Sequence, residues 1–325
     1  MTTFRRALTG AAAVAALALA APLPAQQWPT KPVKIVVPFP PGGSADPIAR
    51  AFGNKLSATL GQQFIVENRA GASGSIGTGY VAKSPADGYT YVLVFDTHAV
   101  NPVLIPNLPF DTVRDLAPVM LVGRAPMALA MHPAKPYKSF ADVLAAARAR
   151  PATVNYGSVQ NGSLGHLTMM LLQQAGGFSM VHVPYKGAAP MITDAVAGHI
   201  EMGIGSVAVV APQVRGGKLR AVAVTGESRS TVLPEVPTLA EQGFPGFSAH
   251  AWWALFAPAG TPRPIIERLH AELRAALAQP DVGKQFAEQL GMQVAGSTPE
   301  ELQRFLQDEM ARWGKVVRDN NIRLE

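Results

Sequence analysis

The sequence predicts an α/β fold with two mainly parallel sheets. Short runs of apolar, often β-branched residues alternate along the chain with segments of helical periodicity, which is the pattern of repeated β-α-β units. With 325 residues, the chain exceeds the size that a single hydrophobic core usually serves. Its 30 glycines and 28 prolines supply the many short turns that such units need. We therefore expect two lobes.

Residues 1–25 have the three parts of a secretory signal peptide. The basic pair Arg5-Arg6 precedes an uncharged run of Ala, Val and Leu over 11–21, and Ala25 is the small residue before the expected cleavage point. Cleavage after Ala20 is the alternative. The apolar run is too short to span a bilayer. We expect export to the periplasm as a soluble protein.

Composition argues against several classes of function. The formal net charge of +6 falls to +4 once Arg5 and Arg6 are removed, and the remaining charges are scattered without a basic run. Nucleic-acid binding is therefore not expected, whereas a mildly positive protein favours anionic ligands. The chain has no cysteine, so it has no disulfide, no thiol nucleophile and no cysteine for a lipid anchor.

A strand, a glycine-rich loop and a helix come first in the mature chain. Val33 to Phe39 is mostly apolar and rich in β-branched residues, as in a buried parallel strand, and the run Pro40-Pro41-Gly42-Gly43 ends it. Asp46 precedes a proline, which predicts a helix N-cap followed by proline at the first helical position. Apolar residues at every fourth position then extend the helix to Leu60.

The same alternation continues to the C-terminus. Strands are predicted at 64–66, 89–95, 129–131, 153–156, 181–183, 202–204 and 219–224. One helix is predicted to begin within 71–79, and further helices are predicted at 140–150, 164–174, 189–197, 264–277, 281–290 and 299–319. The last of these helices opens with a threonine cap, a proline and two acidic residues.

Two chain crossings divide the mature chain into lobes. We place them near Gly123-Arg124 and within 249–256. Lobe 1 is then discontinuous, with residues 26–123 and 252–325, and lobe 2 comprises 124–251. Two crossing segments form a hinge about which the lobes can close on a ligand.

Two glycine-rich loops precede predicted helices and are candidate anion sites. One is Pro40 to Asp46, and the other runs from Gly157-Ser158 to Asn161-Gly162-Ser163. Free N–H groups and the helix dipole favour an anion at such helix starts, although the glycines could serve only to turn the chain. His166, in the first turn of the second helix, is either a ligand contact or a packing residue.

Other motifs favour a binding protein over an enzyme. Gly77 to Ala82 matches the dinucleotide pattern GxGxxA, with Asp96 ending the next strand, but Gly77 lies too far beyond the preceding strand. No GxSxG serine, HExxH pair or nucleophile–base pair is present. We therefore expect no catalytic residue, no metal site and no cofactor.

Several segments resemble one known family. Val36 to Gly43, with Asp46 and Arg50, resembles the opening signature of the tripartite tricarboxylate transporter receptors, the Bug-type solute-binding proteins. Five further segments resemble that family in the family's order, and with the first they cover nearly the whole mature chain: 66–72, 101–102, 183–187, 234–243 and 257–262.

The resemblance implies a two-lobed periplasmic-binding-protein (Venus-flytrap) fold with a ligand between the lobes. The ligand's carboxylate would be held by main-chain amides, hydroxyls and water. The residues that the resemblance assigns to ligand binding are Phe39, Gly43, Asp46, Ser73 and Thr97 in lobe 1 and Ser158, Ser163, His166, Tyr185 and Asp194 in lobe 2.

Some of these assignments carry alternatives. Asp46 would act through water or by ordering its loop, and Arg50 would brace that loop. Asp194 would meet an amino or hydroxyl group of the ligand or order water, and Tyr185 could equally be scaffold. His98, a further candidate for ligand binding, stands where a small residue is expected, so we expect a cleft that is narrower or more polar.

The function implied is that of a monomeric periplasmic receptor and not an enzyme. It would capture a small organic acid (a di- or tricarboxylate or an aromatic acid) for a permease with one large and one small membrane subunit. The alternative is an orphan ligand-sensing subunit that presents the solute to a signalling partner.

Overall fold

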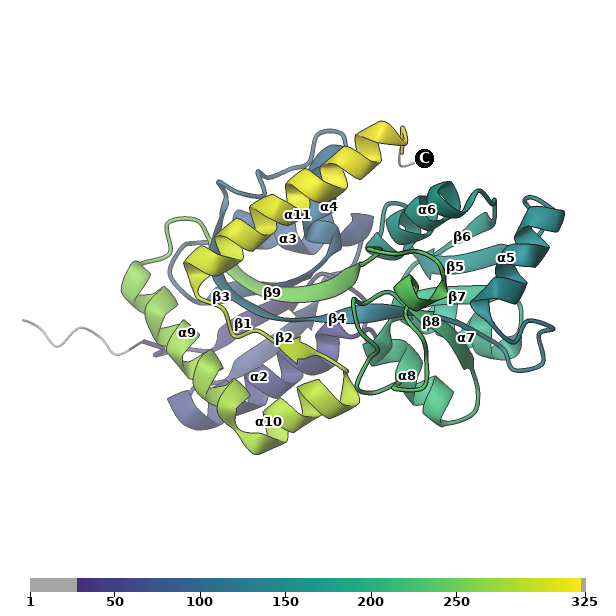
Figure 1. Cartoon of the computed structure of the whole chain (residues 1–325). Coiled ribbons are helices and arrows are strands. Elements are labelled where there is room, and N and C mark those ends of the chain that lie inside the picture. Colours follow the sequence, from purple (N-terminus) through teal and green to yellow (C-terminus); the bar gives the residue numbers. More distant parts are fainter. Residues whose placement is uncertain (1–27, 323–325) are drawn as a thin grey trace, which may run out of the picture.

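Two sheets that share one long strand organise the protein (Figure 1). A computed structural model describes residues 28–322. The predicted α/β class is confirmed, and helices cover the faces of both sheets. The predicted signal peptide and its cleavage point lie outside the described residues. None of the helices within 28–322 is both long and apolar enough to cross a membrane.

The sheet of lobe 1 has the strand order β2-β1-β3-β9-β4, with β10 on the free side of β4. Its strands are β1 (Val33–Val37), β2 (Phe64–Asn68), β3 (Thr90–Phe95), β9 (His250–Pro258), β10 (Gln293–Val294) and the first part of β4 (Leu116–Met131). β1 is parallel to β2 and β3, whereas β9 is antiparallel to both β3 and β4.

The sheet of lobe 2 is built on the second part of β4. That part lies between β7 (Met202–Ser206) and β8 (Arg220–Val224), both antiparallel to it. β5 (Asn155–Val159) then pairs in parallel with β7 and with β6 (Val181–Tyr185). Both sheets are thus mixed rather than mainly parallel, because the strands that join the lobes run against their neighbours.

The hinge lies in β4 and at the start of β9. β4 pairs with β9 as far as Pro126, opposite His250, and pairs with β7 and β8 from Met127 onward. The boundaries that we propose from the sequence, 123/124 and 251/252, lie close to this change of partner.

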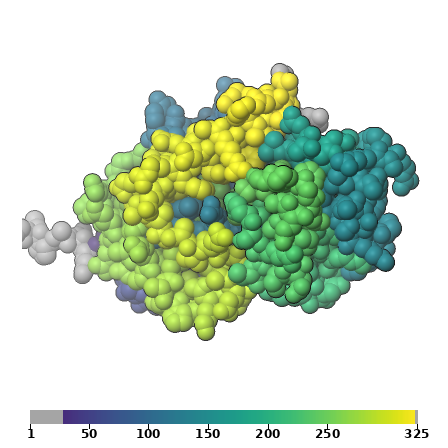
Figure 2. Space-filling model, viewed as in Figure 1, coloured from purple at the N-terminus to yellow at the C-terminus, as the bar shows by residue number. Residues whose placement is uncertain are grey.

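Helices of lobe 1 lie on both faces of its sheet. They are α2 (Ala45–Leu60), α3 (Ser75–Ala82), α4 (Thr97–Leu104), α9 (Arg263–Ala278), α10 (Pro280–Lys284) with a π-helical turn at Gln285–Gln289, and α11 (Pro299–Asp319). α11 packs on α4 and β4 and reaches lobe 2 at its far end, where the yellow and teal surfaces meet in Figure 2.

Four helices cover the sheet of lobe 2: α5 (Phe140–Ala149), α6 (Leu164–Gly176), α7 (Ala188–Ala197) and α8 (Val207–Arg215). The sequence did not predict α4, α8 or the full length of β4. α4 contains Pro102 and α8 contains Pro212, and these prolines masked the helical pattern.

The predicted N-cap role of Asp46 is wrong. α2 begins at Ala45, Ser44 holds the cap position, and Asp46 lies inside the first turn. Its carboxylate instead accepts hydrogen bonds from Arg50 and Asn68, which outcompete a bond to the helix's own amides. Asp46 still places a negative charge at the helix start, where the dipole stabilises it.

The predicted cap of the last helix is present and can be tested. The Thr298 hydroxyl accepts from the Glu301 amide at 3.2 Å, and the Glu301 carboxylate accepts from the Thr298 amide at 2.8 Å. Thr298→Ala should lower the free energy of unfolding by about 1 kcal/mol in urea titrations, because one helix amide loses its partner. Thr298→Ser keeps the hydroxyl and should lose less than half of that. Equal losses in the two variants would show that the methyl group matters and the cap does not.

Candidate functional site

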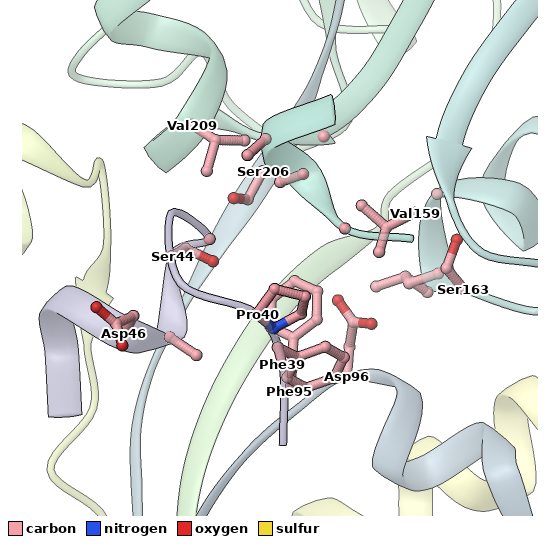
Figure 3. A pocket seen from close by; sticks show the side chains of 18 of the residues that line it. Phe39, Pro40, Ser44, Asp46, Phe95, Asp96, Val159, Ser163, Ser206 and Val209 are labelled. Carbon is pink, nitrogen blue, oxygen red and sulfur yellow. The ribbon is translucent and has the colours of Figure 1, made fainter. Parts of the chain in front are cut away.

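A cavity between the two lobes brings helix starts from both of them together (Figure 3). It encloses about 730 Å³ of empty space, its open mouth included. Its lining is mostly apolar and comes from loops that follow strands: Phe39, Pro40, Pro41, Gly43, Ser44, Ala45, Asp46, Phe95, Asp96, Met127, Val159, Ser163, Leu164, Gly165, Gly187, Ala188, Ala189, Pro190, Ile204, Gly205, Ser206 and Val209. This position matches the rule that open α/β sheets bind ligands beyond the carboxyl ends of their strands.

The lobe 1 wall is the loop between β1 and α2. Gly42 has φ +88°, a conformation that a side chain would strain, and it lets the chain turn sharply into the helix. The side-chain amide of Asn68 donates to the Phe39 carbonyl at 3.1 Å and so ties this loop to the end of β2. The Trp253 indole N–H donates to the Ser44 hydroxyl at 3.1 Å. The loop is therefore held from a neighbouring strand and from the hinge strand β9.

Asp46 braces this loop from inside α2. Its carboxylate accepts from Arg50 Nε at 2.8 Å and from Asn68 Nδ2 at 2.9 Å. Burial alone would raise the pKa of Asp46, but the bonds from Arg50 and Asn68 outweigh it and hold that pKa below its usual range. Arg50 contacts Asp46 and Asn68 and not the loop itself, so the bracing role expected from the sequence would act through Asn68.

The lobe 2 wall consists of three helix starts. Ser163 caps α6, Gly187 precedes α7, and Ser206 precedes α8. The Ser163 hydroxyl accepts from the His166 amide, while Gly187 and Ser206 make no side-chain cap bond. Each helix start presents main-chain N–H groups that have no partner within their own helix.

Aromatic rings form the floor of the cavity. The rings of Phe39 and Phe95 meet edge to face with centroids 5.9 Å apart, and Phe95 packs against Trp253 with centroids 5.6 Å apart. These rings fix the shape of the floor and exclude water from one side of a bound ligand.

Asp96 is a lining residue that the sequence did not assign to ligand binding. It follows β3 directly and is 2 % exposed, and neither carboxylate oxygen has a hydrogen-bond partner among the described residues. Burial and the nearby charge of Glu309 raise its pKa well above the usual range. In Figure 3 the Asp96 carboxylate points into the cavity, whereas that of Asp46 lies beside α2. The sequence offered one signal, an acidic residue at the carboxyl end of a buried strand.

The predicted site residues fall into three groups. Phe39, Gly43, Asp46 and Ser163 line the main cavity. Ser73, Thr97 and His98 line a second, smaller cavity on the other side of Phe39 and Phe95. The remaining four, Ser158, His166, Tyr185 and Asp194, line neither of these two cavities.

Ser158 and His166 support Ser163 from behind. The Ser158 hydroxyl lies 3.3 Å from that of Ser163 and 2.7 Å from His182 Nε2. The rings of His166 and His182 stack with centroids 4.1 Å apart, and His166 Nδ1 accepts from the Gly162 amide. Burial lowers the pKa of His166 to about 4 and that of His182 to about 3, so both rings are neutral at pH 7. They position the loop before α6.

Tyr185 and Asp194 bind each other. The Tyr185 hydroxyl donates to the Asp194 carboxylate at 2.7 Å, and His199 lies 3.2 Å from the other carboxylate oxygen. Asp194 is therefore already satisfied within lobe 2, and Asp96 is the carboxylate that faces the cavity without a partner among the described residues.

His98 lies behind the floor and not in the main cavity. It is 2 % exposed, its ring lies against Phe110 and Phe256, and its Nε2 has no partner among the described residues. The geometry therefore does not support the expectation that His98 makes the main cavity narrower or more polar.

Basic and metal-binding groups are scarce around the cavity. Within residues 28–322, the lining contains no Lys, Arg or His, and no cluster of three or more His, Asp or Glu could hold a metal ion. The positive potential that the lining offers comes from the starts of α2, α6, α7 and α8.

His98 makes stability depend on pH. Burial lowers its pKa to about 3, so as pH falls below about 6.5 the unfolded chain takes up a proton that the folded chain does not. Stability is therefore lost between that pH and the folded pKa, by about 2 kcal/mol from this group at pH 5. His98→Gln and His98→Leu should both show a smaller difference in free energy of unfolding between pH 7 and pH 5. An unchanged difference in both variants would mean that His98 titrates normally.

Comparison with known proteins identifies the family. Residues 48–322 match the model of the tripartite tricarboxylate transporter family receptor. Protein BugT of Bordetella pertussis is 39% identical over 314 residues, covering 96% of each chain. Two solved structures are also similar. The R. palustris protein Rpa4515 with adipate has a TM-score of 0.87 and 37% identity, covering 91% of this chain and 99% of that one. MatC of Rhodopseudomonas palustris with bound malate has a TM-score of 0.83 and 32% identity, covering 89% and 100%.

These similarities extend over nearly the whole described chain and so cover residues of both lobes. Such relatives are solute-binding proteins and not enzymes, and the family's members are periplasmic binding proteins. The chain belongs to the tripartite tricarboxylate transporter family receptors.

Proposed function

We propose that this receptor captures a small organic carboxylate between its lobes, with the carboxylate bound by main-chain amides. The observation that carries the proposal is the meeting of four helix starts, those of α2, α6, α7 and α8, at one cavity. Free amides and helix dipoles stabilise an anion without a basic side chain. The adipate and malate in the two similar structures support this ligand class.

The receptor delivers its ligand to a membrane permease with one large and one small subunit, after export directed by residues 1–25. The chain acts as a monomer. Closure about the hinge in β4 and β9 buries the ligand. The family membership and the two-strand hinge support this part of the proposal.

The residues that we assign to ligand contact are those of the cavity wall. Gly43 and Ser44 contribute amides from lobe 1, and Ser163, Ala188 and Ser206 do so from lobe 2. Phe39 and Phe95 cover the ligand's carbon skeleton. Hydrophobic walls with a few placed polar groups are typical of small-molecule sites.

Ligand binding should raise thermal stability by mass action. A carboxylate at about a hundred times its Kd adds about 2.7 kcal/mol to the free energy of unfolding. A thermal-shift screen of mono-, di- and tricarboxylates, aromatic acids and amino-bearing carboxylates should find at least one that stabilises, with reversible binding and no turnover in titration calorimetry. The matching amides are the controls. Stabilisation by amides but by no carboxylate would contradict the proposal.

Asp46→Asn should weaken carboxylate binding about tenfold without unfolding the protein, because Asn68, which donates to the Phe39 carbonyl of the loop, loses its charged acceptor. Calorimetry measures the affinity and circular dichroism the fold. Asp194→Asn is the matched control, since its carboxylate binds Tyr185 away from the cavity. If Asp46→Asn and the unsubstituted protein bind the carboxylate with equal affinity, the loop before α2 does not contribute to the binding site.

A further inference from the structure

Asp96 has the position of a helix cap but does not cap. It is the residue before α4, and aspartate is among the residues preferred there because its carboxylate can accept from the helix amides. Its side chain makes no such bond. The carboxylate turns instead into the cavity between the lobes (Figure 3).

A buried carboxylate without a partner is costly. Asp96 is 2 % exposed, and both oxygens lack hydrogen-bond partners among the described residues. Desolvation of an unpaired charge costs several kcal/mol, so proteins pair nearly all of them. Such a group in a binding cavity points to a partner that arrives with the ligand.

Among the described residues, no cationic side chain pairs with Asp96, and only the main-chain amides of Leu164 and Thr97 favour its ionised form. The other lining carboxylate, Asp46, is paired with Arg50 and Asn68. The side chain of Glu309 raises the pKa of Asp96 further, and that carboxylate accepts from the indoles of Trp252 and Trp313. The amides of Thr97 and Leu164 face Asp96 without reaching hydrogen-bond geometry.

We propose that Asp96 binds a cationic amino group of the ligand, so that the substrate class is an amino-bearing carboxylate. This inference rests on the proposed function and narrows it. The ligand's carboxylate lies at the helix starts, its ammonium group lies on Asp96, and its carbon skeleton lies against the aromatic floor. A zwitterionic ligand has no net charge, so its burial does not require a basic side chain in the lining to neutralise it.

In an alternative arrangement, Asp96 would donate a hydrogen bond to the ligand instead of accepting one. A protonated Asp96 could donate to a second carboxylate of a diacid. The two arrangements differ in what the ligand must carry, an ammonium donor or a carboxylate acceptor, and this difference decides the experiment.

Matched ligand pairs test the proposal. The pairs are phenylalanine with 3-phenylpropanoate, leucine with 4-methylpentanoate, 2-aminoadipate with adipate, and 6-aminohexanoate with hexanoate, titrated by calorimetry at pH 7.5. In at least one pair, the amino compound should bind at least about tenfold tighter, as expected for one charge-assisted hydrogen bond.

Two variants assign the preference to Asp96. Asp96→Asn keeps the size of the side chain and removes its charge. It should abolish the preference, because the affinity for the amino compound falls while the affinity for the plain acid changes by less than about threefold. Asp46→Asn should weaken both members of a pair equally, because that carboxylate acts on the loop and not on the ammonium group. Thermal unfolding without ligand confirms that each variant folds.

The outcomes separate the two proposals. Binding of the plain acids with no amino preference would overturn the role of Asp96 and leave carboxylate capture intact. A second result would also overturn the role of Asp96. If adipate binds more weakly at pH 7.5 than at pH 5.5 in the unsubstituted protein, but equally at both in Asp96→Asn, then a protonated Asp96 donates to the diacid. Failure of every compound, plain or amino-bearing, would contradict both.

Discussion

The pairing of β4 with β9 is the constraint on which the rest of the structure depends. The two strands run antiparallel from Leu116 opposite Pro258 to Pro126 opposite His250, and β4 then continues into the sheet of lobe 2. Because the strand does not end between the lobes, the carboxyl ends of β1 and β3 face those of β5, β6 and β7 across one gap. The loops that leave these strands, and the helices that follow them, therefore meet at the cavity.

This arrangement explains how a cavity without basic lining residues can hold an acid. Each helix start contributes partial positive charge and free amides, fixed in place by the strand that precedes it. The basic residue Arg50 bonds Asp46, Asp46 accepts from Asn68, and Asn68 donates to the Phe39 carbonyl of the loop. Because backbone amides are common to all residues, the ligand class is set mainly by the side chains between them, of which Asp96 and the two phenylalanines are the most distinctive.

Local patterns in the sequence predicted much of the fold. Val33 to Phe39, the helix to Leu60 and the capping box at Thr298 were recognisable because each is defined by residues near in the chain. β9 and the full length of β4 were not, because these two strands pair with each other across more than a hundred residues of chain. Asp46 was misassigned as a cap because Asn68, which competes for its carboxylate, comes from another strand.

The candidate site was predictable only in part for the same reason. The two glycine-rich loops gave Phe39, Gly43, Asp46 and Ser163, which line the cavity. The acidic side chain that faces the ligand is decided by contacts between residues far apart in the chain or in different elements. Asp194 accepts a hydrogen bond from Tyr185, whereas Asp96 has no partner among the residues described. Neither fact is visible in the order of residues.

A crystal structure of the receptor with its captured ligand tests the central claim most directly. The account predicts a ligand carboxylate within hydrogen-bond distance of main-chain amides at the starts of α2, α6, α7 or α8, with no Lys or Arg in contact with it. A carboxylate bound by a basic side chain, or a ligand seated outside the cavity between the lobes, would contradict it.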